Sequence, residues 1–150
     1  MRNIVVLLFL IFSCQTSSLY DNEIRPVITM KRTACYGTCP QYIITIYKDG
    51  KTIYEGINFV NKIGRYQAYL TQKDVSNILT NIDELNFFEL DHCYDSPITD
   101  IPSVILKVET HHKTHKVIDR FNGPKSLKNI YKLIDHSIDR IIKWDTLMTQ

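Results

Sequence analysis

Cys35 and Cys39 are the residues whose type and spacing most clearly allow chemistry. Residues 35–40 read Cys-Tyr-Gly-Thr-Cys-Pro, so three residues separate the two thiols. In an oxidising compartment, two cysteines at this spacing can approach to bonding distance, with Gly37 permitting a tight turn between them. Closing a loop of about five residues would stabilise the fold by about 2 kcal/mol through chain entropy. The spacing therefore predicts a local disulfide between Cys35 and Cys39.

The same thiols allow two other chemistries. Thiol-disulfide exchange enzymes use C-x-x-C at a helix N-terminus, where the helix dipole lowers the thiol pKa. Here the spacing is C-x-x-x-C, and a β-rich run follows Pro40. Cys35, Cys39, His92 and Cys93 are acceptable zinc ligands in type and number, although no C-x-x-C or H-x-x-x-H spacing accompanies them. A redox or metal-binding module using Cys35, Cys39 and Cys93 is the alternative function, and otherwise no cofactor is expected.

A second candidate segment is the irregular stretch from residue 91 to residue 102, which is rich in Asp and Pro. Its candidate functional residues are Cys93, Tyr94, Asp95 and Asp100. Asp95 and Asp100 could act as paired carboxylates, yet aspartates in such loops more commonly bond their own backbone. The chain carries no G-x-S-x-G, H-E-x-x-H, P-loop or dinucleotide motif. We therefore expect a loop that contacts a partner, and no catalytic residues.

The first fourteen residues have the pattern of an export signal. A basic residue at position 2 precedes the unbroken apolar run Ile4–Phe12. This run has signal-peptide length but falls short of the roughly 20 residues that span a membrane. Ile11, Ser13 and Cys14 resemble the lipobox of bacterial lipoproteins, with an aliphatic residue at −3, a small residue at −1 and a cysteine that receives lipid. Phe12 stands where a small residue is usual, which leaves a secreted protein without lipid as the alternative.

The lipobox resemblance implies the organisation of the chain. It implies a lipoprotein signal peptide over residues 1–13 and membrane attachment through several acyl chains on Cys14. Gln15 stands where an aspartate would favour inner-membrane retention, so we expect an outer-membrane protein in the periplasmic or surface leaflet. Residues 14–26 are polar and aperiodic and predict a tether, which leaves residues 27–146 as one domain. A formal net charge of +2, without a basic run, argues against nucleic acid as a partner.

Alternation of apolar and polar residues, rich in β-branched and aromatic side chains, predicts strands in much of this domain. Asp49-Gly50 predicts a hairpin turn, because this pair supplies the positive φ angles that a tight turn requires. A second hairpin is expected after residue 102. The six predicted strands cover residues 27–33, 42–47, 52–59, 65–70, 103–109 and 115–120.

Two segments have helical periodicity instead. The first follows Thr71, whose spacing to Asp74 is that of a capping box, and its apolar stripe runs from residue 75 to residue 85. The second starts at Gly123-Pro124, with Pro124 at the first helical position, and its stripe runs from residue 127 to residue 141. Hairpin strands pair antiparallel, and a helix with one apolar stripe needs a sheet face to cover. The expected fold is α+β, an antiparallel sheet of about six strands in the order ββββαββα with two helices packed on one face.

The uncovered face of such a sheet would mix Tyr, Thr, Lys and Glu, so it is either solvated or a binding surface. Five tyrosines fall on the predicted strands. They are expected to pack across neighbouring strands, with contact to a ligand as the alternative. These residues are Tyr42, Tyr47, Tyr54, Tyr66 and Tyr69.

Residues 32–42, together with Asp49-Gly50 and Tyr54-Glu55-Gly56, resemble an uncharacterised domain family of exported bacterial proteins, domain of unknown function 6438. The hallmark of that family is a C-x-G-x-C-P loop before a strand, which this chain has at residues 35–40. The resemblance spans about residues 27–144 and implies one domain, but it implies no activity. The expected function is a lipid-anchored cell-envelope protein that binds an envelope partner and catalyses no reaction.

Overall fold

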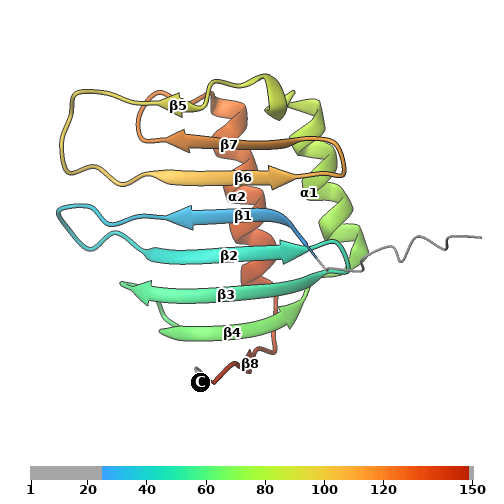
Figure 1. Ribbon diagram of the computed structural model, residues 1–150. Coiled ribbons are helices and arrows are strands. Elements are labelled where there is room, and N and C mark those ends of the chain that lie inside the picture. The colour runs from blue at the N-terminus through green and yellow to red at the C-terminus, as the bar shows by residue number, and fades with distance from the viewer. Residues whose placement is uncertain (1–24, 149–150) are drawn as a thin grey trace, which may run out of the picture.

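The computed structural model describes residues 25–148, which form an eight-stranded sheet with two helices behind it (Figure 1). The fold is therefore α+β, as predicted. The helices are α1 (Gln72–Glu84) and α2 (Lys125–Asp139), and the 3-10 turn η1 (Phe87–Glu89) follows α1. The strands are β1 (Pro26–Arg32), β2 (Gln41–Tyr47), β3 (Lys51–Asn58), β4 (Gly64–Tyr69), β5 (Cys93–Tyr94), β6 (Val104–Glu109), β7 (Thr114–Asp119) and β8 (Asp145–Thr146).

The strands lie in the order β5-β7-β6-β1-β2-β3-β4-β8. All six predicted strands are present and pair antiparallel with one another. The predicted antiparallel sheet of about six strands is nevertheless only roughly consistent with the structure. β5 and β8 each add a two-residue strand at one edge, and β5 pairs parallel with β7, so the sheet is mixed. Two residues are too few to show alternation, and β5 lies within the stretch 91–102 that was expected to be irregular.

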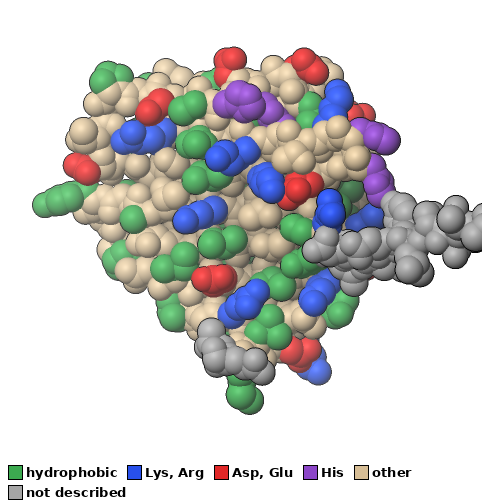
Figure 2. All heavy atoms as spheres, in the orientation of Figure 1, with side chains coloured by type: hydrophobic (Ala, Val, Ile, Leu, Met, Phe, Trp, Pro, Cys, Tyr) green, Lys and Arg blue, Asp and Glu red, His purple; other side chains and the backbone are tan. Residues whose placement is uncertain are grey.

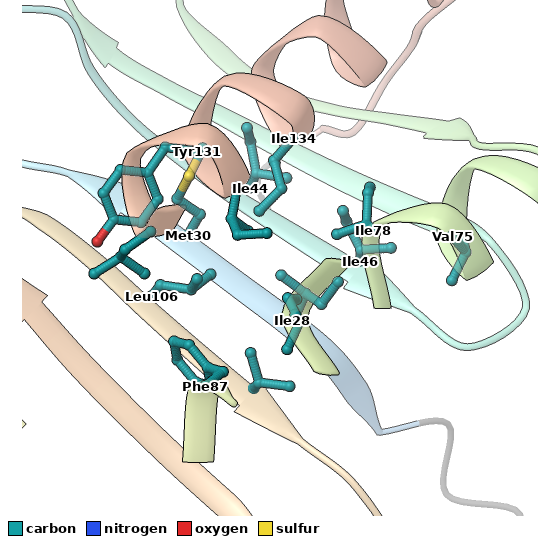
Figure 3. Packing of buried hydrophobic residues seen from close by; sticks show 14 of the residues in the cluster. Ile28, Met30, Ile44, Ile46, Val75, Ile78, Phe87, Leu106, Tyr131 and Ile134 are labelled. Carbon is teal, nitrogen blue, oxygen red and sulfur yellow. The ribbon is translucent and has the colours of Figure 1, made fainter. Parts of the chain in front are cut away.

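One face of the sheet carries the hydrophobic core. Ile28 and Met30 of β1, Ile44 and Ile46 of β2 and Leu106 of β6 share this face and are at most 1 % exposed. They alternate along their strands because successive strand residues point to opposite faces. Both helices cover this face with their apolar stripes (Figures 1 and 3). The same cluster includes Val75, Ile78, Phe87, Tyr131 and Ile134.

The predicted turn at Asp49-Gly50 is confirmed between β2 and β3. Gly50 has a φ of 88°, a conformation that favours glycine. Its N–H donates to the Tyr47 carbonyl at 3.0 Å, and the Asp49 carboxylate accepts the N–H of Lys51 at 3.0 Å. These contacts fix the register of the hairpin that leads into β3.

The start of α1 has the predicted cap. Thr71 Oγ1 accepts the N–H of Asp74 at 3.1 Å, and the Thr71 hydroxyl donates to the Asp74 carboxylate at 2.6 Å. The Thr71 hydrogen bond lowers the pKa of Asp74 against the effect of burial, and Arg140 at 2.5 Å adds to the lowering. The start of α2 differs from expectation by one residue. Pro124 is the cap, because its ψ of 145° is extended, and the helix begins at Lys125.

The other face of the sheet is open. Figure 2 views this face and shows Lys and Arg side chains interspersed with hydrophobic ones. Lys31 lies opposite Ile105 in the sheet, and Lys107 lies opposite Lys116. No helix in the described part of the chain is long and apolar enough to cross a membrane.

Candidate functional site

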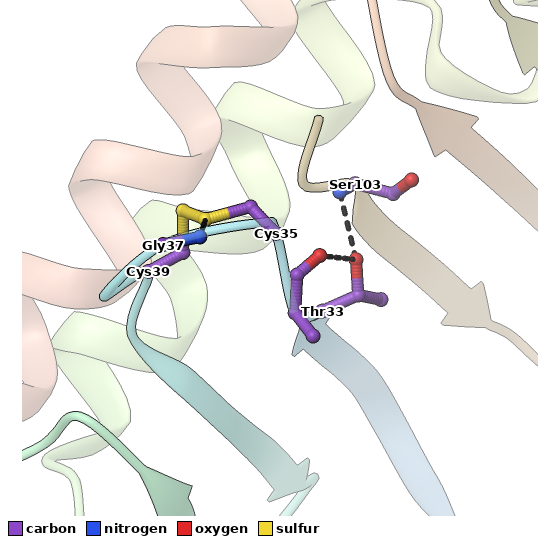
Figure 4. The surroundings of a disulfide bond; sticks show 6 residues. Thr33, Cys35, Gly37, Cys39 and Ser103 are labelled. Atoms are coloured by element: carbon purple, nitrogen blue, oxygen red, sulfur yellow. Dashed lines mark hydrogen bonds between the residues drawn. A yellow bond between two sulfur atoms is a disulfide. The ribbon is translucent and has the colours of Figure 1, made fainter. Parts of the chain in front are cut away.

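The predicted disulfide joins Cys35 and Cys39 in the loop between β1 and β2, and their Cα atoms are 5.8 Å apart. The Gly37 N–H donates to Cys35 Sγ at 3.3 Å inside this ring (Figure 4). The role expected of Gly37 was wrong. Its φ is not in the left-handed region, and an added Cβ would meet only Cys35 Sγ, at 3.9 Å. The turn therefore does not depend on the conformational freedom of glycine.

The disulfide loop is hydrogen-bonded to the loop that precedes β6. The Thr33 N–H donates to the Ser103 carbonyl at 3.0 Å. The Ser103 N–H donates to the Thr33 hydroxyl at 2.8 Å (Figure 4). Nearer the tip, the Tyr36 N–H donates to the Asp100 carbonyl at 3.2 Å. Asp100 has a left-handed φ of 62°, which aspartate tolerates better than most residues. We call residues 33–40 and 95–103 the paired loops.

The predicted functional residues of the second loop make structural contacts. Cys93 and Tyr94 form β5 beside β7. Asp95 accepts the N–H of the next residue at 2.7 Å and lies 3.3 Å from the guanidinium of Arg120. Asp100 contributes its backbone carbonyl to the paired loops. These are the contacts of aspartates that shape a loop.

The alternative zinc ligands are not assembled into one group. The disulfide joins Cys35 and Cys39, so neither thiol can bind a metal while the bond is intact. Cys93 is a free, exposed cysteine, and His92 Nδ1 lies 3.3 Å from the Lys116 carbonyl. Within residues 25–148, no three His, Cys, Asp or Glu side chains come together as a metal site would require.

Large apolar side chains are exposed on and beside the paired loops. Tyr36 is 92 % exposed, Ile98 is 46 % exposed and Phe121 is 39 % exposed. Figure 2 shows a hydrophobic side chain projecting from the left edge of the molecule, where Figure 1 places the loop between β1 and β2. The chain enters the sheet at Pro26, at the opposite end of β1 (Figure 1). The paired loops therefore lie at the end of the sheet that is farthest from Pro26, where the chain enters the sheet.

A pocket of about 390 Å³ lies on the helix side of the sheet. Its walls are the start of β2, the middle of β3, the loop between β3 and β4, the last turns of α2 and the segment after α2. Pro40, which follows the disulfide, is one of its lining residues. The pocket therefore borders the paired loops. Its volume is in the range of small-molecule sites.

Aromatic rings form one side of the pocket. Tyr42 and Tyr54 stack with their ring centroids 5.6 Å apart, and Trp144 lies 5.8 Å from Tyr54. Tyr66 continues the row at 6.5 Å from Tyr54. The predicted packing of tyrosines across strands is thus confirmed for Tyr42, Tyr54 and Tyr66. These rings lie on the helix side of the sheet, however, and not on the uncovered face where they were expected. Tyr69 is 62 % exposed.

Arg32, Tyr42 and Asp135 form a closed triad beside these rings. Arg32 donates to the Tyr42 hydroxyl at 2.6 Å and to Asp135 Oδ2 at 2.5 Å, and the Tyr42 hydroxyl donates to Asp135 Oδ1 at 2.6 Å. Burial lowers the pKa of Arg32, but the charges and hydrogen bonds of Asp135 and Tyr42 together raise it above its ordinary value. Burial and the hydrogen bond to Asp135 raise the pKa of Tyr42, against a smaller lowering by Arg32. Both carboxylate oxygens of Asp135 are therefore occupied, and its charge is compensated.

Asp139 lies one helical turn after Asp135 and also lines the pocket. No ion pair or hydrogen bond of its side chain is found within residues 25–148. Burial raises the pKa of Tyr54, and the charges of Asp139 and Asp135 raise it further. The field of both carboxylates therefore reaches the aromatic side of the pocket. Lys62, from the loop between β3 and β4, is the basic residue among the lining residues.

The loop between β3 and β4 is held over the sheet by a close backbone approach. A Cβ on the buried Gly56 would collide with the Lys62 carbonyl, so only glycine allows this loop to fold back. Phe59 has a φ of 52°, which is unusual for an aromatic residue. Its N–H is held by the Asn58 side chain at 3.0 Å. The wall that carries Lys62 is therefore a defined loop.

Sequence reasoning missed this pocket because its residues come from five separate segments. Asp135 and Asp139 flank the apolar stripe of α2, and Trp144 follows the last predicted element. The available signal was the set of three tyrosines at positions 42, 54 and 66, which the predicted hairpins bring to one face.

Residues 26–138 match the family described as Domain of unknown function (DUF6438). The chain belongs to this family. The DUF6438 match runs from β1 almost to the end of α2, so it includes the paired loops and Asp135 but stops before Asp139 and Trp144. No curated protein matches the chain. Membership of the DUF6438 family therefore assigns the domain and no activity.

Proposed function

We propose that this chain is a lipid-anchored protein of the bacterial cell envelope that binds another envelope protein through the paired loops. In this proposal the lipid on Cys14 holds it at the outer membrane, and it catalyses no reaction. The observation that carries the proposal is the 92 % exposure of Tyr36 at the tip of a disulfide-closed loop that a second loop braces.

The construction of the paired loops suits binding. Ordering a loop on association costs about 0.5–1.5 kcal/mol for each side chain that is immobilised, and a loop already held in one conformation avoids much of this cost. The disulfide and the hydrogen bonds among Thr33, Ser103 and Asp100 provide such a restraint. Tyrosine is enriched among the residues that dominate protein interfaces. An exposed Tyr36 on a restrained loop is thus well suited to anchor a partner.

The position of the paired loops suits attachment through the N-terminal side of the domain. β1 begins at Pro26 and spans about 20 Å at about 3.3 Å per residue. The paired loops follow at its far end. Cys14 lies outside the described residues and precedes Pro26 in the chain. A lipid there would leave the far end of the sheet accessible to a partner.

Intact mass spectrometry of the membrane-extracted protein tests the anchor. We expect a mass that corresponds to a chain starting at Cys14 and carrying acyl groups. The Cys14→Ser variant should lose both the acyl mass and the membrane fraction. A native protein without acyl mass would contradict the proposed anchor.

Site-specific photo-crosslinking in intact cells tests the binding surface. A photoreactive amino acid at position 36 should give a discrete adduct with one envelope protein. The same amino acid at position 142 is the control, because Ile142 is fully exposed but lies outside the paired loops. Replacing Cys35 and Cys39 with serine should reduce the adduct at position 36. Equal labelling from positions 36 and 142, or none from position 36, would contradict the proposal.

A further inference from the structure

The pocket between β2, β3 and α2 has the composition of a site for a positively charged organic group. Tyr42, Tyr54 and Trp144 supply aromatic surface to one cavity of about 390 Å³. The faces of such rings carry negative partial charge and attract ammonium groups, most strongly where water is partly excluded. The rings alone would also accept a neutral apolar group. The charged residues of the pocket decide whether it favours a cation or a neutral apolar group.

On the α2 side of the pocket, the charge that is available to a ligand is the negative charge of a carboxylate. Asp135 has both oxygens occupied by Arg32 and Tyr42, so it contributes little net charge. Asp139, one turn later, has no ion-pair partner within the described residues and lines the same cavity. Burial raises the pKa of Tyr54, and the charge of Asp139 raises it further, more than the charge of Asp135 does. An uncompensated carboxylate beside aromatic rings favours a cation over an anion.

Lys62 lines the pocket, and Arg32 is hydrogen-bonded to the lining residues Tyr42 and Asp135. Arg32 is held in the triad and is compensated by Asp135. Lys62 is exposed on the loop between β3 and β4. Its long side chain can keep the ammonium group in water while its stem covers the pocket edge. Lys62 makes no ion pair with Asp139 within the described residues, so it opposes a bound cation without neutralising that carboxylate.

We infer that this pocket is a binding site for an organic ammonium ion, with the cation against the rings of Tyr54 and Trp144 and its charge opposite Asp139. The inference does not depend on the proposed function, because it concerns a concave site on the helix side rather than the exposed tip of the paired loops.

Trp144 provides the measurement, because it is the single tryptophan of the chain and lines the pocket. Its fluorescence is followed while tetramethylammonium chloride or choline chloride is added to the protein at constant ionic strength. We expect a saturable change with a half-point at roughly millimolar ligand. The matched control is 3,3-dimethylbutan-1-ol, which has the shape of choline without its charge. An equal response to this alcohol would overturn the inference in favour of a merely apolar pocket.

Two charge variants test the geometry. Asp139→Asn keeps the size of the side chain, and its exposed position leaves the core intact, so the affinity for tetramethylammonium should fall about tenfold. Lys62→Gln should raise the affinity a few-fold, because it removes the opposing charge. Tyr36→Ala should leave the titration unchanged. Unchanged affinity in Asp139→Asn, or weaker cation binding in Lys62→Gln, would overturn the inference. So would a saturable response to N-acetylglucosamine with none to tetramethylammonium, which would indicate a carbohydrate site.

Discussion

Removing the disulfide is the perturbation whose size follows most directly from the structure. Cys35 and Cys39 are separated by four positions, so the bond closes a loop of about five residues. In the chain-entropy description, cross-linking such a loop removes about 7 cal/mol/K from the unfolded chain, which corresponds to about 2 kcal/mol at room temperature. The double variant Cys35→Ser, Cys39→Ser should therefore lose about 2 kcal/mol of unfolding free energy. Its melting temperature should fall by roughly 5–10 °C.

The loss should not be much larger, because other contacts of the paired loops do not involve sulfur. The two hydrogen bonds between Thr33 and Ser103 lie at the base of the loops and remain available to the variant. The hydrogen bond from Tyr36 to Asp100 is nearer the tip and should become less protected from solvent exchange. The variant thus separates the stabilisation by the disulfide, which closes one loop, from the stabilisation by the hydrogen bonds that join the two loops.

Urea unfolding of the oxidised protein, the reduced protein and the double variant provides the assay. Reduced protein and double variant should agree, and the dependence of unfolding free energy on urea should stay nearly the same in all three. Cys93→Ser is the control, because this cysteine is free and exposed, and its replacement should change stability by less than about 0.5 kcal/mol. Equal stability with and without the disulfide would refute the entropic reasoning. A loss above about 4 kcal/mol would show that the bond supports more of the sheet than its own loop.

Four other substitutions have defined outcomes. Gly123→Ala would drive a Cβ into the buried Asp119 carboxylate, so it should cost about 1–3 kcal/mol in urea unfolding, whereas Gly37→Ala has room and should cost less than about 0.5 kcal/mol. Thr71→Ala removes the cap of α1 and should cost about 1 kcal/mol, measured the same way at neutral pH. The pKa of Tyr42 is higher in the folded protein than in the unfolded chain. Its contribution to the free energy of unfolding is therefore complete below about pH 10 and is lost as the pH rises further. Stability should therefore fall less steeply above pH 10 in Tyr42→Phe than in the wild type, and a steeper fall in the variant would contradict the raised pKa.

The features that the sequence predicted correctly are those encoded by neighbouring residues. The turn at Asp49-Gly50, the cap at Thr71 and the disulfide each depend on residues within four or five positions of one another. The alternation in β2 and β3 likewise needs only the local order of side chains. Each of these features brings its own physical signal, which is why it could be predicted without the tertiary structure.

The features that the sequence did not predict depend on residues far apart in the chain. β5 gains its strand conformation from β7, and β8 gains its conformation from β4. Asp135 lies beside Arg32 only because α2 crosses the face of the sheet that carries the end of β1. The paired loops contain one feature of each kind. The local Cys35–Cys39 bond was predicted, whereas the contact between Tyr36 and the distant Asp100 was not.

The paired loops and the pocket are connected through the disulfide loop, but experiment can still separate them. The disulfide loop leads directly into β2, whose Tyr42 belongs to the pocket, so a change at Cys35 could in principle disturb both. The triad argues against strong coupling. Arg32 and Tyr42, at the two ends of the disulfide loop, are both bound to Asp135 of α2 and lie in adjacent strands. Because this connection bypasses the loop, loss of the disulfide should weaken cross-linking from position 36 while the fluorescence response of Trp144 to tetramethylammonium is retained. A parallel loss of both signals would show instead that the paired loops and the pocket form a single site.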